Sequence, residues 1–148
     1  MKCNSLVFVL VIFLFLGLCE KNPSEPQNGK ESEVILEPGE WTATADFGGF
    51  DFFVNENSDY ITQIKYNFSS WQCGGRTMSG SITVSSDPGW EITDLQFSIE
   101  MDLDPDPFKK EPITIEGTFE TSNTAAGTWE ATVNNTTCSG DWEGQPKN

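Results

Sequence analysis

The sequence contains no histidine, so it lacks the side chain that most often serves as general base near neutral pH and as metal ligand. Basic residues are also few: 8 lysines and arginines stand against 23 acidic residues, and Arg76 is the only arginine. The formal net charge is −15. An acidic surface of this kind repels nucleic acids and anionic lipids, so we expect no nucleic-acid partner.

No apolar run is long enough for a transmembrane helix. The longest covers residues 6–18, and a helix of that length rises about 20 Å, short of the roughly 30 Å of a bilayer's hydrocarbon core. This run follows Lys2 and ends shortly before polar residues, which is the layout of a secretory signal peptide. We therefore expect residues 1–18 to be removed on export.

The end of this segment, Leu16-Gly17-Leu18-Cys19, resembles the lipobox of bacterial lipoproteins. In that family the cysteine is diacylated and becomes the first mature residue; a small residue usually precedes it, whereas Leu18 is large. The resemblance implies that Cys19 carries a lipid anchor, which holds the exported protein at a bacterial membrane, on the periplasmic side or at the cell surface. Two acyl chains suffice for stable anchoring. The alternative is an ordinary cleaved signal with an incidental cysteine.

Composition divides the mature chain into a linker and a domain. Residues 19–39 carry three prolines, two glycines and five glutamates, so we expect a flexible, lipid-anchored linker. The apolar residues 34–36 could instead form a short first strand. Residues 40–148 form the expected folded domain. Without residues 1–18 the chain keeps 7 basic and 23 acidic residues, which gives 7 − 23 = −16.

Apolar residues alternate with polar ones along most of the domain, and turn residues separate the alternating runs. This period of two is typical of strands buried on one face, and no run shows a helical period. We predict an all-β fold, a small antiparallel β-sandwich of about eight strands, with a barrel as the alternative. The alternating segments are residues 41–47, 50–54, 60–68, 82–84, 95–101, 113–119, 127–133 and 138–142.

The chain has four cysteines, of which two remain free to pair in the domain. Cys3 leaves with the signal peptide and Cys19 is the lipidation site. In an exported protein, we expect the remaining Cys73 and Cys138 to form one structural disulfide.

Short motifs in the domain resemble a group of small secreted bacterial β-sandwich modules of unknown role. They include Cys73-Gly74-Gly75, Ala126-Gly127-Thr128-Trp129 and Cys138-Ser139-Gly140, and the resemblance spans residues 41–142. It implies the fold and the paired cysteines. It implies no activity.

The densest group of side-chain oxygens is formed by Asp102, Asp104 and Asp106. Alternate aspartates can converge on calcium in loops that place glycine sixth and a bidentate glutamate twelfth. Those positions are Pro107 and Ile113 in this chain. The favoured interpretation is therefore a solvated acidic loop, with a weak calcium site as the alternative and no other cofactor.

Trp71 and Trp90 fall outside the alternating runs, in segments that we predict to be loops. Loops at the ends of a β-sandwich often carry binding residues. Together with Arg76, a planar bidentate donor, the two indoles are candidate contacts for a glycan or peptide. The competing interpretation is that both indoles fold back over the open ends of the core.

We find no nucleophile with a base, no phosphate loop and no metal-ligand motif, and therefore expect no enzymatic activity. The sequence favours a lipid-anchored cell-envelope protein that binds a glycan, a peptide or an envelope protein. The alternative is a structural spacer or interaction subunit of a surface assembly, held in place by edge strands.

Overall fold

The computed structural model describes residues 34–104 and 109–147, which belong to one compact unit, Ser32–Asn148. The predicted signal peptide, Cys19, most of the predicted linker and Asp106 lie outside the described residues. Eight strands, and no helix, are found in the described part of the chain: β1 (Gly39–Ala45), β2 (Gly48–Val54), β3 (Tyr60–Cys73), β4 (Arg76–Glu91), β5 (Gln96–Asp102), β6 (Pro112–Thr121), β7 (Thr124–Val133) and β8 (Thr136–Pro146).

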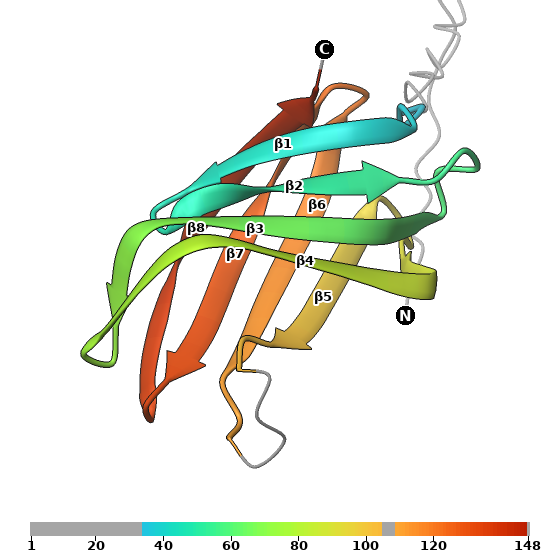
Figure 1. Cartoon of the computed structure of the whole chain (residues 1–148). Helices are drawn as coiled ribbons and strands as arrows, with labels where there is room; N and C mark the ends of the chain where they lie inside the picture. The colour runs from blue at the N-terminus through green and yellow to red at the C-terminus, as the bar shows by residue number, and fades with distance from the viewer. Residues whose placement is uncertain (1–33, 105–108, 148) are drawn as a thin grey trace, which may run out of the picture. The chain divides into compact units, whose positions relative to one another are not determined.

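All eight strands belong to one antiparallel sheet, in the order β4-β3-β2-β1-β8-β7-β6-β5. Strands β1 to β4 form one meander and β5 to β8 a second, and the pairing of β1 with β8 joins them, for example Ala43 opposite Gly144. In Figure 1 the first meander crosses in front of the second. Strands β4 and β5 are the two ends of the sheet, and a short turn connects them, so the sheet is nearly barrel-shaped.

The prediction of an antiparallel all-β domain of eight strands is confirmed, but the structure is not clearly the two-sheet sandwich that we favoured. The hydrophobic alternation identifies which side chains face the core. It does not identify which strands are neighbours, and a sandwich and a barrel share the same alternation. The pairing of the first strand with the last joins all eight strands into one sheet, and this distinguishes the structure from a sandwich of two sheets.

Aromatic side chains fill the interior between the two meanders. Trp142 is 2 % exposed, and its ring centroid lies 5.1 Å from that of Phe50 in an edge-to-face arrangement. Its indole Nε1 donates to the carbonyl oxygens of Glu116 and Thr128 at 3.0 and 3.2 Å, which satisfies the buried donor. The other buried aromatics are Trp41, Phe47, Phe52, Tyr66, Phe68, Trp71, Phe97, Phe119 and Trp129.

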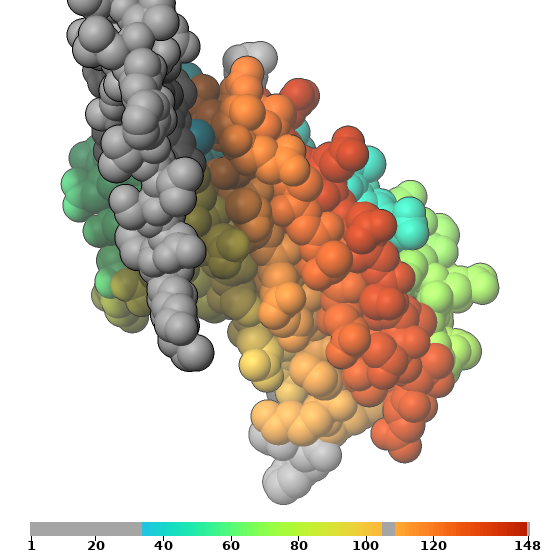
Figure 2. All heavy atoms as spheres, turned by 180° about the vertical axis from the view of Figure 1, so that it is seen from behind, coloured from blue at the N-terminus to red at the C-terminus, as the bar shows by residue number. Residues whose placement is uncertain are grey.

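The outer face of the second meander is polar. Figure 2 shows β6, β7 and β8 in orange to red as one continuous surface. Hydroxyl and carboxylate side chains alternate there with the buried residues. Examples are Thr114 and Glu116 on β6, Thr128 on β7, and Asp141 and Glu143 on β8. Such a face suits a ligand with many hydrogen-bonding groups better than it suits an apolar ligand.

Two β-bulges interrupt the pairing of β3 with β4. At the first, Ser69 and Ser70 lie opposite the single residue Ser79, and Ser70 has a positive φ of 55°. The extra residue moves the core-facing positions from even to odd numbers, so that Trp71 is buried. At the second, residues 86–89 lie opposite Thr62.

Trp71 and Trp90 therefore lie in strands β3 and β4, which corrects the prediction that both lie in loops. Each bulge breaks the period of two. The segment after the bulge then no longer continues the alternation that marks a strand in the sequence.

The predicted disulfide between Cys73 and Cys138 is confirmed, with the two Cα atoms 6.1 Å apart. It connects β3 to β8, which are not neighbours in the sheet. The disulfide therefore ties the two meanders together across the interior.

The last residues of the predicted linker pack on the domain. Leu36 is only 6 % exposed, and its carbonyl oxygen accepts a hydrogen bond from Ser58 Oγ at 3.0 Å. The carbonyl oxygen of Glu37 accepts one from Trp41 Nε1 at 3.1 Å. Residues 34–38 form no strand, and β1 begins at Gly39, one residue before the predicted domain boundary. No helix that could span a membrane occurs in residues 34–104 and 109–147.

Candidate functional site

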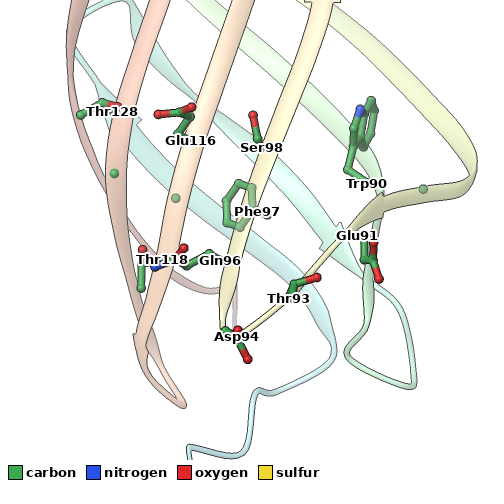
Figure 3. A pocket seen from close by; sticks show the side chains of 13 residues that line it. Trp90, Glu91, Thr93, Asp94, Gln96, Phe97, Ser98, Glu116, Thr118 and Thr128 are labelled. Carbon is green, nitrogen blue, oxygen red and sulfur yellow. The ribbon is translucent and has the colours of Figure 1, made fainter.

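A groove of about 890 Å³ lies at the edge of the sheet, beside the turn from β4 to β5 (Figure 3). We call it the edge groove. Its volume falls within the roughly 300–1,000 Å³ typical of small-molecule sites. It is lined by residues 89–91 of β4, by Thr93 and Asp94 of the turn, and by residues 96–98, 116–118 and 127–128 of β5, β6 and β7.

The turn that closes one end of the groove is a two-residue hairpin turn. The backbone N–H and C=O groups of Thr93 and Gln96 form two hydrogen bonds of 2.9 Å with each other. The central residues Asp94 and Leu95 both have positive φ, 52° and 64°, as a type I′ turn requires. Leu95 rarely adopts this conformation, but its carbonyl oxygen accepts a hydrogen bond of 2.8 Å from Phe119 N. The turn thus presents Asp94 to the groove in a fixed conformation.

Trp90 forms one wall of the groove, and the second bulge positions it. The bulge ends at Gly89, whose φ is 122°, and a Cβ at Gly89 would lie 2.6 Å from the carbonyl oxygen of Ile61. Only glycine fits this close approach, after which Trp90 pairs with Ile61. The Trp90 indole is partly buried against the core and partly exposed in the groove. Packing against the core therefore fixes the position of the indole ring, and a ligand can reach its exposed part.

The opposite wall comes from three neighbouring strands. Figure 3 shows Ser98 on β5, Glu116 on β6 and Thr128 on β7 in successive positions across the sheet, with Thr118 two residues further along β6 beside Gln96. All of these side chains are exposed. Phe97 also borders the groove, but it is 5 % exposed and its ring packs in the interior against Trp142. The wall therefore offers hydroxyl and carboxylate groups at regular strand spacing.

The groove carries negative charge only. Glu91, Asp94 and Glu116 are exposed, and their side chains form no hydrogen bond or ion pair with any other described residue. No lysine or arginine is part of the lining. An aromatic face beside hydrogen-bond acceptors can stack on a sugar ring while the acceptors bind its hydroxyl groups, and it can also bind a cation.

Of the predicted ligand-binding residues, only Trp90 lines the edge groove. Trp71 is 8 % exposed, and its ring packs in the interior against Phe68 and Trp129, with centroids 5.8 and 5.5 Å away. The structure therefore places Trp71 in the core, as the competing interpretation had it. Its face is covered by other rings and is not presented to a ligand.

Arg76 belongs to a group of charged residues at the other end of β5, which we call the ion-pair cluster. Its guanidinium pairs with the carboxylate of Glu111, which is 1 % exposed, and lies 3.6 Å from Asp104. Lys109 Nζ lies 2.6 Å from Glu111 Oε1 and 3.1 Å from Asp104 Oδ2. These carboxylates raise the pKa of Lys109, the hydrogen bond to Glu111 most of all. Arg76 is thus engaged with partners from the chain itself.

Two of the predicted calcium ligands, Asp102 and Asp104, take part in the same cluster. Asp102 Oδ1 accepts hydrogen bonds from the backbone N of Glu111 at 2.9 Å and of Asp104 at 3.2 Å. Lys110 Nζ lies 3.5 Å from Asp102. Among the described residues, which exclude Asp106, no group of three side chains is placed to hold a metal ion. The calcium site stays a prediction.

The pKa of Asp102 is held below its ordinary value, mainly by the hydrogen bond from the Glu111 backbone, with help from Asp104 and Lys110. A lowered folded-state pKa means that the Asp102 carboxylate stabilises the fold above its unfolded pKa of about 3.9, and that this stabilisation is lost as the pH falls through the folded-state pKa. We therefore expect Asp102→Asn to be less stable than the wild type at pH 7, in thermal unfolding, with the difference shrinking below about pH 4. A difference that stays constant with pH would contradict this origin.

Sequence reasoning found Trp90 but missed Glu91, Asp94 and Glu116. The sequence indicates only that Glu116 points outward from an alternating strand and that Thr93 and Asp94 are typical turn residues. Neither indicates that the three residues surround one groove, because that depends on how β4 and β5 meet. Comparison with protein-family models, with curated proteins and with solved structures finds no match for this chain.

Proposed function

We propose that the protein is an exported, lipid-anchored cell-envelope protein that binds a glycan or peptide in the edge groove and has no enzymatic activity. The observation that carries this proposal is the partly exposed Trp90 beside exposed hydroxyl and carboxylate groups in a groove of about 890 Å³. Most other large aromatic side chains are buried. Aromatic side chains beside placed polar groups are a usual feature of ligand sites.

Binding accounts for the groove better than catalysis does. The chain has no histidine to transfer protons near neutral pH. Anchoring through Cys19 would place the acidic domain at a bacterial membrane, next to envelope glycans and proteins. A peptide ligand could use the same aromatic and polar contacts. A glycan makes fuller use of the hydroxyl groups on β5, β6 and β7.

Thermal unfolding with a ligand panel tests the proposal. The mature chain with Cys19→Ser, which avoids the lipid, is unfolded with and without envelope polysaccharides and peptides. A ligand at 100 times its Kd stabilises the folded state by about 2.7 kcal/mol, which raises Tm by several degrees. We expect at least one ligand to produce a saturable rise, and Trp90→Ala to abolish it.

Phe53→Ala is the matched control, because Phe53 is 42 % exposed on β2 and is not part of the groove lining. It should leave the ligand-induced rise unchanged. A rise that survives Trp90→Ala would show that the ligand binds elsewhere. Release of cleaved ligand by the wild type would show an enzyme.

A second function, as a spacer or interaction subunit, is favoured by the two ends of the sheet. Strand β4 has 16 residues, and in the described part of the chain β5 and β4 share only the bridge between Thr93 and Gln96 at their common turn. An unpaired strand edge can accept a strand from another protein. Crosslinking to one envelope protein that persists in Trp90→Ala would favour this function.

A further inference from the structure

The edge groove has no counterion within the described part of the chain. Arg76, Lys109 and Lys110 are taken up by the ion-pair cluster at the other end of β5. Lys147 lies 2.7 Å from Glu40 and 3.7 Å from Asp51. Lys65, on β3, is not part of the groove lining. The carboxylates of Glu91, Asp94 and Glu116 therefore face solvent without a partner among the described residues, in the groove that Trp90 also lines.

Two features of the groove favour the same kind of ligand charge. Carboxylates attract cations, and the face of an indole ring attracts them as well, through its quadrupole. A ligand with acidic groups would be repelled by the groove and by the net charge of −15 of the whole chain. A neutral ligand would leave the complementary charge unused.

From this complementarity we propose that the ligand is a glycan whose sugar rings carry free, protonated amino groups. The ammonium groups lie against Glu91, Asp94 or Glu116, and a ring stacks on Trp90. The ring hydroxyls bind the exposed side chains of the opposite wall. This inference rests on the proposed function and names its ligand class.

A sugar ring fits the groove better than a lysine side chain. Exposed hydroxyl groups come from three adjacent strands, at Ser98, Thr118 and Thr128 (Figure 3). Ser98, Glu116 and Thr128 are register partners and form a row across β5, β6 and β7, with adjacent strands about 4.8 Å apart, and Thr118 lies two residues further along β6. A lysine side chain has one polar group at its tip and would leave most of the row without a partner.

Isothermal titration calorimetry with three matched ligands tests the proposal: a glucosamine tetrasaccharide, its fully N-acetylated counterpart and tetralysine. The acetylated sugar has the same rings without charge, and tetralysine has the amines without rings. We expect the glucosamine tetrasaccharide to bind at least about tenfold more tightly than either, the smallest factor expected from one charge-assisted hydrogen bond. The preference should weaken as salt is added.

Glu116→Gln removes one groove charge while keeping the shape, and Glu143→Gln makes the same change on β8, outside the groove lining. We expect Glu116→Gln to weaken binding of the glucosamine tetrasaccharide at least threefold without affecting the acetylated sugar, and Glu143→Gln to change neither.

Equal binding of the two sugars through Trp90 would overturn the amine inference and leave the proposed function standing. Tetralysine binding as tightly as the glucosamine sugar would overturn the requirement for a sugar. Failure of all three ligands, with a saturable ligand elsewhere in the panel, would also overturn the inference.

Discussion

Replacing Cys73 and Cys138 together by alanine should lower the free energy of unfolding by about 4 kcal/mol. The two residues are 65 positions apart, and the disulfide closes that loop in the unfolded chain as well. Losing it raises the conformational entropy of the unfolded state, and the effect is close to the whole stability of many small domains. Alanine is chosen because Cys73 is 4 % exposed and a serine hydroxyl would be buried there.

Chemical denaturation of the wild type, the reduced wild type and the double variant measures this effect. The reduced wild type should be as unstable as the double variant, since both lack the cross-link. A loss below about 1 kcal/mol in both would show that the pairing between β1 and β8 already holds the two meanders together without it.

Replacing Arg76 by alanine should lower the free energy of unfolding by about 3 kcal/mol, the second-largest effect that we predict. Glu111 is 1 % exposed, and removing its arginine partner leaves a buried carboxylate with Lys109 as its neighbour. Breaking a buried ion pair from one side costs roughly 3–5 kcal/mol, and both the 36 % exposure of Arg76 and the remaining lysine place the expected value at the lower end. Denaturant unfolding at neutral pH measures it.

Two variants serve as controls for Arg76→Ala. Lys147→Ala breaks an exposed ion pair with Glu40 and should have a much smaller effect, because solvent screens such pairs. Combining Arg76→Ala with Glu111→Gln should recover part of the lost stability, because the buried charge is then gone. If Arg76→Ala costs no more than Lys147→Ala, the ion-pair cluster does not stabilise the fold.

The sequence predicted the strands well because each has a buried face. Each of the eight alternating segments overlaps one observed strand, and even the short segment 82–84 lies inside the long β4. Only two segments extend beyond their strands, 41–47 past the end of β1 and 95–101 by one residue before β5. The disulfide was predictable because only two cysteines remain for the domain. Both predictions depend on local pattern or on counting, which a sequence displays directly.

Features that depend on contacts between distant residues were not predictable. The pairing of β1 with β8 decides between barrel and sandwich, and it joins residues about one hundred positions apart. Arg76 and Glu111 are separated by 35 positions, so nothing in the sequence marked Glu111 as a buried partner. Trp71 was assigned to a loop because a bulge changes which residues face the core, and a bulge leaves little trace in the pattern.

Leu36 shows a further limit of composition. Its surroundings are rich in proline and glutamate, which is typical of a linker, yet its side chain is buried and its carbonyl oxygen is bound by Ser58. One apolar side chain is too weak a signal to overcome the composition of the segment. The packed part of the chain therefore includes Leu36, four residues before the predicted boundary at residue 40, although the first strand begins only at Gly39.

The edge groove as ligand site is tested most directly by a two-dimensional NMR titration of the five indole N–H signals with the glucosamine tetrasaccharide. The indole signal of Trp90 should shift saturably, together with the amide signals of Ser98 and Thr118, while those of Trp71 and Trp129 stay in place. Saturable shifts confined to other parts of the domain, with the Trp90 signal unmoved, would contradict the edge groove as the binding site.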